Sequence, residues 1–189
     1  MRFTNLLEVL EQQRRIAIPI QIGSREHICY QDSVLIHVSD DKEMHLATQR
    51  LVNSENLNKF QRTFVIDLSL GMETYPDGTR VYLPLDTLQV CSALSRVEEE
   101  MNQFKHRSCL LVLLGLEQVW NLKHPEKEAQ IFLKKLIRCF NRVIRSHQAL
   151  GIAVIASQHP NPWLHPFFAH IVQPSDFHFQ SRDETQGIL

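Results

Sequence analysis

Two uninterrupted apolar runs constrain the fold more than any other feature of this sequence. Residues 109–114 (CLLVLL) and 151–156 (GIAVIA) are apolar at every position. A strand without alternation between apolar and polar side chains is buried on both faces, as in a parallel sheet. Between the two runs, residues 127–147 place apolar side chains at helical spacing. The order strand, helix, strand predicts a right-handed crossover within a parallel sheet.

The same alternation is expected along the rest of the chain. Further strands are predicted at residues 16–22, 33–38, 63–68 and 80–85, and further helices at residues 4–15, from the capping residues 39–41 to about 52, and 87–104. The expected fold is one α/β domain over residues 1–189, with an N-terminal helix within residues 1–15. Its mainly parallel sheet is flanked by helices on both faces. A last pair of short strands, at 170–172 and 177–180, predicts a small antiparallel extension at the C-terminal edge.

Composition narrows the possible partners and compartments. The chain carries 20 Lys and Arg against 21 Asp and Glu, so any binding of nucleic acid or anionic membrane would need a local basic patch. Its four cysteines form no C-x-x-C pair, which suits a reducing compartment. We expect no signal peptide, because residues 1–10 have mixed charge and no apolar core, and no run approaches the roughly 18 apolar residues that span a bilayer. We expect a soluble intracellular protein, nuclear if its source is eukaryotic.

Common catalytic and metal-binding motifs are incomplete. Four histidines, spaced 6, 5 and 8 residues apart, lack the tight pairing of zinc ligands (His159, His165, His170 and His178). A nuclease could begin at Asp77, but no later Glu-x-Lys pair completes its metal site. No G-x-S-x-G elbow supports a serine hydrolase. We therefore expect no metal and no cofactor.

A basic stripe runs along the long helix predicted at residues 127–147. Its members lie at spacings of 4, 4 and 3, with one further lysine close by (Lys134, Arg138, Arg142 and Arg145, with Lys135). Side chains at this spacing share one helix face, which could contact a phosphate backbone. The alternative is an ordinary solvated face, partly neutralised by Glu126 and Glu128 one turn earlier.

The segment after the last apolar run combines aromatic residues with prolines. Its apolar residues stand between Pro160, Pro162 and Pro166 (Trp163, Leu164, Phe167 and Phe168). Stiff aromatic surfaces of this kind are typical of protein–protein contacts. The alternative is that these residues close the core over the sheet edge.

In sequence, about residues 85–186 resemble the core of RecA-type recombinases and their eukaryotic paralogues. The matching segments are LSRVEEEMNQFKHRSCLLVLLGLEQVW, IFLKKLIRCFNRVIRSHQALGIAVIASQ and FFAHIVQPSDFHFQSRDETQ, and residues 33–52 add a weaker match. The resemblance implies a RecA-like core. It also implies that Gln158 matches the family's polar switch residue after the last core strand. An unrelated α/β domain with the same element order is the alternative.

The family's catalytic residues are largely missing. Its phosphate loop, G-x-x-x-x-G-K-[ST], needs two glycines and a lysine. After the first predicted strand this chain has only GSREH at residues 23–27. Leu114, followed by Gly115, fills the position of the magnesium-binding acid and cannot ligate a hard cation. Asp40 or Asp41 could match the water-positioning glutamate, or simply cap the following helix. The resemblance thus implies a degenerate ATPase core that is not an enzyme.

The function that the resemblance implies is that of a divergent recombinase paralogue. Such subunits, as in Shu-type complexes, pair with related RecA-like subunits in a hetero-oligomer. They promote assembly of the recombinase filament on single-stranded DNA in homologous recombination. Two alternatives stay open: an Elongator-type accessory subunit in transfer-RNA modification, and an ATPase subunit active only at a shared interface, with Gln158 acting in trans.

Overall fold

The structure is a computed structural model of the 189-residue chain. It describes residues 18–22, 25–29, 32–52, 59–69, 74–103, 108–119, 126–156 and 162–172. The strands of the main sheet are β3 (Ser33–Val38), β4 (Arg62–Asp67), β5 (Thr79–Tyr82), β6 (Cys109–Leu114), β7 (Leu150–Ala156) and β8 (His170–Val172). The helices are α2 (Asp41–Leu51), α4 (Thr87–Gln103) and α6 (Glu126–His147), with short 3₁₀ turns η1 (Leu116–Gln118) and η2 (Pro162–Phe167).

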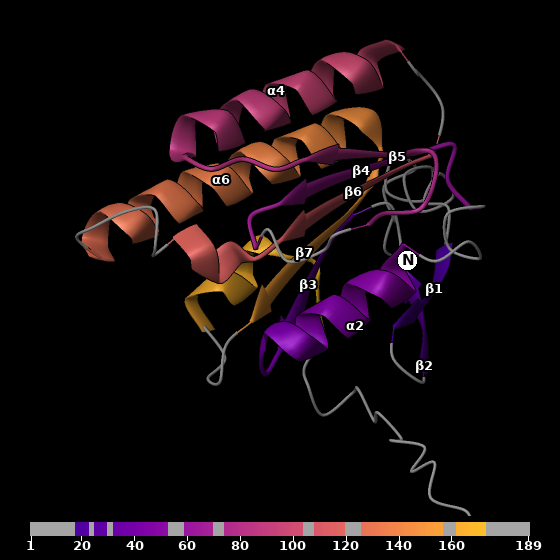
Figure 1. Ribbon diagram of the computed structural model, residues 1–189, viewed down its shortest axis with the longest axis horizontal. Helices are drawn as coiled ribbons and strands as arrows, with labels where there is room; N and C mark the ends of the chain where they lie inside the picture. Colours follow the sequence, from indigo (N-terminus) through magenta and orange to yellow (C-terminus); the bar gives the residue numbers. More distant parts are fainter. Residues whose placement is uncertain are drawn as a thin grey trace, which may run out of the picture.

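The six strands lie in the order β5-β4-β6-β7-β3-β8, and every neighbouring pair is parallel. Helices α4 and α6 lie side by side on one face of the sheet, and α2 covers the other face (Figure 1). The prediction of an α/β fold with a parallel sheet between helices is confirmed. Parallel strands need long connections, and the helices supply most of them.

Strand β6 shows why its run of apolar residues has no alternation. Leu111 and Leu113 pack in the cluster under α4 and α6, whereas Leu110 and Val112 pack in the cluster under α2. All four side chains are at most 1% exposed. The strand is therefore buried on both faces, as its sequence predicted.

A separate antiparallel hairpin precedes the main sheet. It consists of β1 (Ile18–Ile22) and β2 (Arg25–Cys29), with Ile18 opposite Cys29. The sequence indicated only the first of these strands, because the charged start of β2 hides its strand character. Residues 25–27, which the comparison with the family's phosphate loop included, thus belong to a hairpin strand. The first strand of the main sheet is β3.

The expected ends of the domain are only partly covered. Strand β8 forms where predicted and runs parallel to β3. The predicted helix at 4–15 and the predicted strand at 177–180 lie outside the described residues, so the antiparallel extension stays a prediction. Across the described segments, no helix is both long and apolar enough to span a bilayer.

Candidate functional site

The carboxyl edge of the sheet is where α/β proteins commonly bind ligands. The turn from β3 to α2 contains only Ser39 and Asp40. The Asp40 carboxylate accepts a hydrogen bond from the backbone N–H of Glu43 at 2.8 Å. The Glu43 carboxylate in turn accepts from the backbone N–H of Ser39 at 2.8 Å. This reciprocal arrangement closely resembles a capping box. Asp40 is thus a helix cap, and the two carboxylates would repel a phosphate at this helix start.

Strand β4 ends at Asp67, a carboxylate that the sequence did not single out. Its side chain is fully buried and accepts three hydrogen bonds: from the Ser69 backbone at 2.8 Å, the Ser69 hydroxyl at 2.6 Å and the Tyr75 hydroxyl at 2.7 Å. Burial, followed by the bond to Asp67, raises the pKa of Tyr75 above its usual range. These hydrogen bonds to Asp67 therefore fix the positions of Ser69 and Tyr75 after β4. An acidic residue ending an apolar run was its only sequence signal.

The ends of β6 and β7 are joined by Glu117. This residue lies in η1, just after β6, and its carboxylate accepts from the backbone N–H of Ala156 at 2.9 Å. Leu114 is buried at the end of β6. No group of three or more His, Cys, Asp or Glu suited to a metal is found in the described part of the chain. Gln158, the expected switch residue, lies outside the described residues.

The basic stripe of α6 and the aromatic segment, treated separately in the sequence, lie together in the structure. The Lys134 ammonium is 5.6 Å from the ring centroid of Trp163. The Arg138 guanidinium carbon is 6.0 Å from the ring centroid of Phe167. The Asn141 side-chain amide also donates to the backbone carbonyl of Phe167. Residues in α6 thus anchor η2, partly through cation–π contacts.

The four apolar residues of the aromatic segment take two different roles. Leu164 and Phe168 are buried in the core cluster under α4 and α6, at 0% and 8% exposure. For these two residues the core-closure alternative describes their place in the fold. Trp163 and Phe167 pack against the same cluster but are only partly buried. Of the predicted partner-binding residues, these two remain accessible at the surface.

The remaining basic residues of α6 are exposed and differ in their partners. Arg142 forms an ion pair with Glu98 of α4 at 3.2 Å. Because both side chains are substantially exposed, this pair adds little stability. Lys135 and Arg145 are exposed on the same helix. They are the members of the stripe best placed to contact a phosphate backbone.

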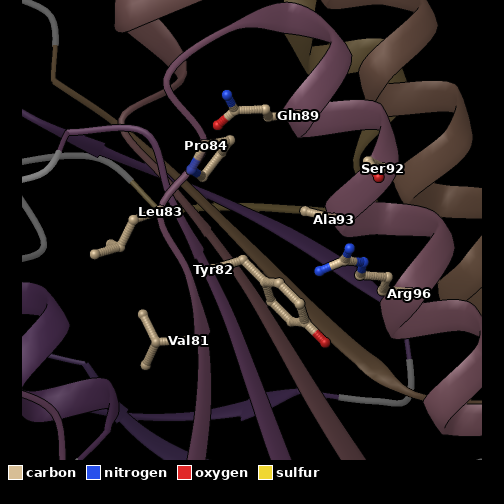
Figure 2. A pocket seen from close by; sticks show the side chains of 8 residues that line it. All are labelled: Val81, Tyr82, Leu83, Pro84, Gln89, Ser92, Ala93 and Arg96. Atoms are coloured by element: carbon tan, nitrogen blue, oxygen red, sulfur yellow. The ribbon is translucent and has the colours of Figure 1, made fainter.

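A groove between β5 and α4 was not foreseen from the sequence (Figure 2). Its volume is about 400 Å³. It is lined by Val81, Tyr82, Leu83, Pro84, Gln89, Ser92, Ala93 and Arg96. Leu83 in this lining is 52% exposed, and two leucines that follow it closely in the chain, Leu85 and Leu88, are exposed by 62% and 81%. All three lie in the strand predicted at residues 80–85 or the helix predicted at 87–104, so no sequence signal indicates the groove.

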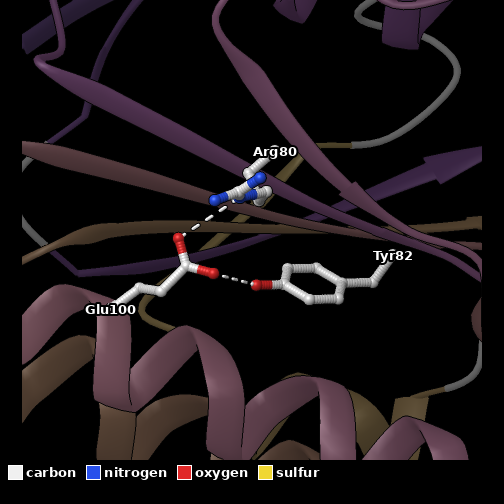
Figure 3. A network of polar contacts seen from close by, with 3 residues as sticks. All are labelled: Arg80, Tyr82 and Glu100. Atoms are coloured by element: carbon white, nitrogen blue, oxygen red, sulfur yellow. Dashed lines mark hydrogen bonds and ion pairs between the residues drawn. The ribbon is translucent and has the colours of Figure 1, made fainter.

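A polar network next to the groove joins β5 to α4 (Figure 3). The Tyr82 hydroxyl donates to one oxygen of Glu100 at 2.6 Å, and the Arg80 guanidinium donates to the other at 3.3 Å. Burial, followed by the hydrogen bond and charge of Glu100, raises the pKa of Tyr82 to about 12. Tyr82 is therefore a neutral donor at physiological pH, and both oxygens of Glu100 are engaged.

Two histidines meet where η2 covers β3. The ring centroids of His37 and His165 lie 5.5 Å apart in an edge-on arrangement. His37 is 1% exposed, and neither of its ring nitrogens has a hydrogen-bond partner within the described residues. Burial, and then the charge of His165, lower the pKa of His37. His37 is therefore held as a neutral imidazole in the core.

No protein-family model matches this chain, and no curated protein matches it. The fold itself defines the chain as an α/β protein with a six-stranded parallel sheet. Within the described residues, two candidate binding surfaces are the groove at β5 and the basic and aromatic surface of α6 and η2.

Proposed function

We propose that this protein is a non-catalytic RecA-like subunit of a DNA-repair complex. In this proposal it pairs with related subunits in the nucleus and promotes recombinase filament assembly in homologous recombination. The observation that carries the proposal is the strand order. Among β3, β4, β6, β7 and β8, the first strand lies between the fourth and the fifth. Dinucleotide-binding and flavodoxin-like sheets place their first strand elsewhere. The strand order therefore sets this sheet apart from those two common α/β classes, and the parallel sheet between helices fits the RecA-like core that the sequence resembles.

The turn after β3 supports a role without ATP hydrolysis. In this strand order, the phosphate loop of an ATPase would connect β3 to α2. Here that connection is the short turn at Ser39 and Asp40, which is capped by the carboxylates of Asp40 and Glu43. Strand β6 ends in Leu114 and is followed by Gly115, and neither side chain offers a ligand for magnesium.

Nucleotide binding tests this part of the proposal. Thermal unfolding of the purified protein should not change when millimolar Mg-ATP is added. A ligand present at a hundred times its Kd would stabilise the fold by about 2.7 kcal/mol, which a melting curve detects readily. A clear rise in Tm would contradict the proposal. A rise seen only with a partner subunit would favour the ATPase that works at a shared interface.

Contact with single-stranded DNA is tested at the exposed cations of α6. Lys135→Ala and Arg145→Ala should each weaken binding of single-stranded DNA by the protein in its complex. Each lost phosphate contact should lower the slope of log K against log salt by about 0.7. Lys42→Ala, on α2 at the opposite face, is the matched control and should leave the slope unchanged. Unchanged slopes for both α6 variants would remove this surface from the proposal.

The identity of the associated proteins distinguishes a role in recombination from a role in transfer-RNA modification. We would purify the tagged chain from its source cells and identify associated proteins by mass spectrometry. RecA-like paralogues or a filament-forming recombinase support the proposal. Subunits of a transfer-RNA modification complex would favour the Elongator-type alternative, because a RecA-like fold without a phosphate loop suits both.

A further inference from the structure

We infer that the groove between β5 and α4 binds an extended segment of a partner protein that carries apolar side chains and a carboxylate. This inference depends only on the groove, and holds whether or not the sheet is of RecA type.

The first observation is that β5 is an edge strand. It pairs with β4 on one side, and no described strand pairs with its other side. An edge strand presents unpaired backbone N–H and C=O groups, to which another extended chain can add. The groove opens beside this edge, between β5 and α4 (Figure 2).

The second observation is the apolar character of the surface around the groove. Proteins often protect edges with charged residues or with proline. Pro84 follows β5 here, but Leu83 and Leu85 stand on either side of it, and Leu88 lies in the first turn of α4. All three leucines are more than half exposed. Large exposed apolar side chains gathered at one place are typical of an interaction surface.

The third observation is the charge of the groove. Arg96 lies on its wall, on the same side as the Tyr82 ring (Figure 2). Both oxygens of the nearby Glu100 are bonded to Arg80 and Tyr82. Among the described residues, none that lines the groove is acidic, and Arg96 forms no ion pair. A groove that combines apolar side chains with an exposed guanidinium complements a segment with apolar residues and one carboxylate.

The experiment is selection of displayed random peptides, each long enough to form one strand, on the full-length protein. We expect the wild type to enrich peptides with alternating apolar residues and an Asp or Glu. Arg96→Glu should instead enrich peptides with Lys or Arg at that position. The matched control Arg145→Glu makes the same charge change on α6 and should keep the acidic preference. Far-UV circular dichroism and thermal melting show whether each variant folds.

A second variant keeps the inference testable if charge reversal harms folding. Arg96→Met removes the charge but keeps the length of the side chain. It should weaken binding of a selected acidic peptide roughly tenfold, the loss expected for one charge-assisted hydrogen bond. Leu83→Asp, in the groove lining, should abolish binding of the same peptide. No enrichment on the wild type, or the same acidic preference on Arg96→Glu, would overturn the inference.

Discussion

At the scale of single residues, Gly115 allows the chain after β6 to lie close to the chain after β4 at the carboxyl edge of the sheet. Its φ is 74°, in the left-handed region where a side chain is strained. A Cβ atom there would also lie 2.7 Å from the backbone nitrogen of Ser69, after β4. Gly78 has a similar φ of 85°, but no atom lies within 4 Å of its expected Cβ. A side chain at Gly78 would therefore meet backbone strain alone, whereas a side chain at Gly115 would meet both strain and a steric clash.

We predict that Gly115→Ala destabilises the protein more than Gly78→Ala. Gly78→Ala should lower the free energy of unfolding by about 1 kcal/mol, from backbone strain alone. Gly115→Ala adds a clash with backbone atoms that cannot rotate away, so its loss should reach about 2–4 kcal/mol. Urea unfolding of both variants measures the difference. Equal losses would show that the loop after β4 moves aside freely.

A second residue-scale prediction concerns His37 and pH. Its pKa in the folded protein lies below the usual value of 6.5, because the imidazole is buried and lies near His165. The unfolded chain therefore binds the proton more readily than the folded protein. The free energy of unfolding should fall as the pH drops below about 6.5, by at most about 1.4 kcal/mol per pH unit from this group. Above about pH 6.5, the contribution of His37 to the free energy of unfolding no longer changes with pH.

His37→Phe provides the comparison for this pH dependence. The variant has no proton to bind at this position, so its stability should vary less between pH 5.5 and 7.5 than that of the wild type. Denaturant unfolding at several pH values measures both slopes. If the variant retained the full slope of the wild type, another group would be responsible.

At the scale of elements, the cap of α2 defines what the turn after β3 can do. Asp40 satisfies one of the free N–H groups of the first helical turn, and Glu43 closes the turn from the other side. Both are negative charges at the positive end of the helix dipole. The turn is consequently a stable helix start, and its charge disfavours an anionic ligand.

The cap is tested by two substitutions of one residue. Asp40→Ala should lower the free energy of unfolding by about 1 kcal/mol, within the range of 0.5–2 kcal/mol for lost caps. Asp40→Asn keeps an oxygen acceptor and should cost much less. Thermal melts of both variants suffice. Equal losses for Asn and for Ala would mean that the charge, rather than the cap hydrogen bond, stabilises the turn.

Periodicity in the sequence was enough to predict most elements, but it did not predict how surfaces combine. The unbroken apolar run of β6 and the helical spacing of the apolar residues in α6 each indicate a burial pattern, so both elements were predicted correctly. The contact of Lys134 with Trp163 joins residues far apart in the chain, and no local pattern encodes it. The groove depends on β5 lying at an edge, which only strand order determines. Strand β2 was missed because its first residues are charged.

At the scale of the whole molecule, the sheet divides the core into two clusters that share the same strands. Neighbouring leucines of β6 face opposite clusters: Leu110 packs under α2, and Leu111 packs under α4 and α6. Because the same strands contribute side chains to both clusters, disruption of one cluster should also destabilise the other. We expect cooperative unfolding of both layers.

Leu110→Ala and Leu111→Ala test this expectation. Each should lower the free energy of unfolding by about 2–5 kcal/mol, because a buried leucine is replaced by a cavity. In both variants, unfolding followed by tryptophan fluorescence and by far-UV circular dichroism should give one coincident transition. Separate transitions in either variant would show that the two layers unfold independently.

The position of β3 in the sheet has a consequence for synthesis of the chain. Its neighbours on both sides are β7 and β8, which follow it by more than a hundred residues. At about 5–20 residues per second, β3 waits roughly 5–20 s on the ribosome before its first neighbour is made. During that time an apolar strand has neither of its partners. The nascent chain should therefore depend on chaperones early, until β7 emerges and pairs between β6 and β3.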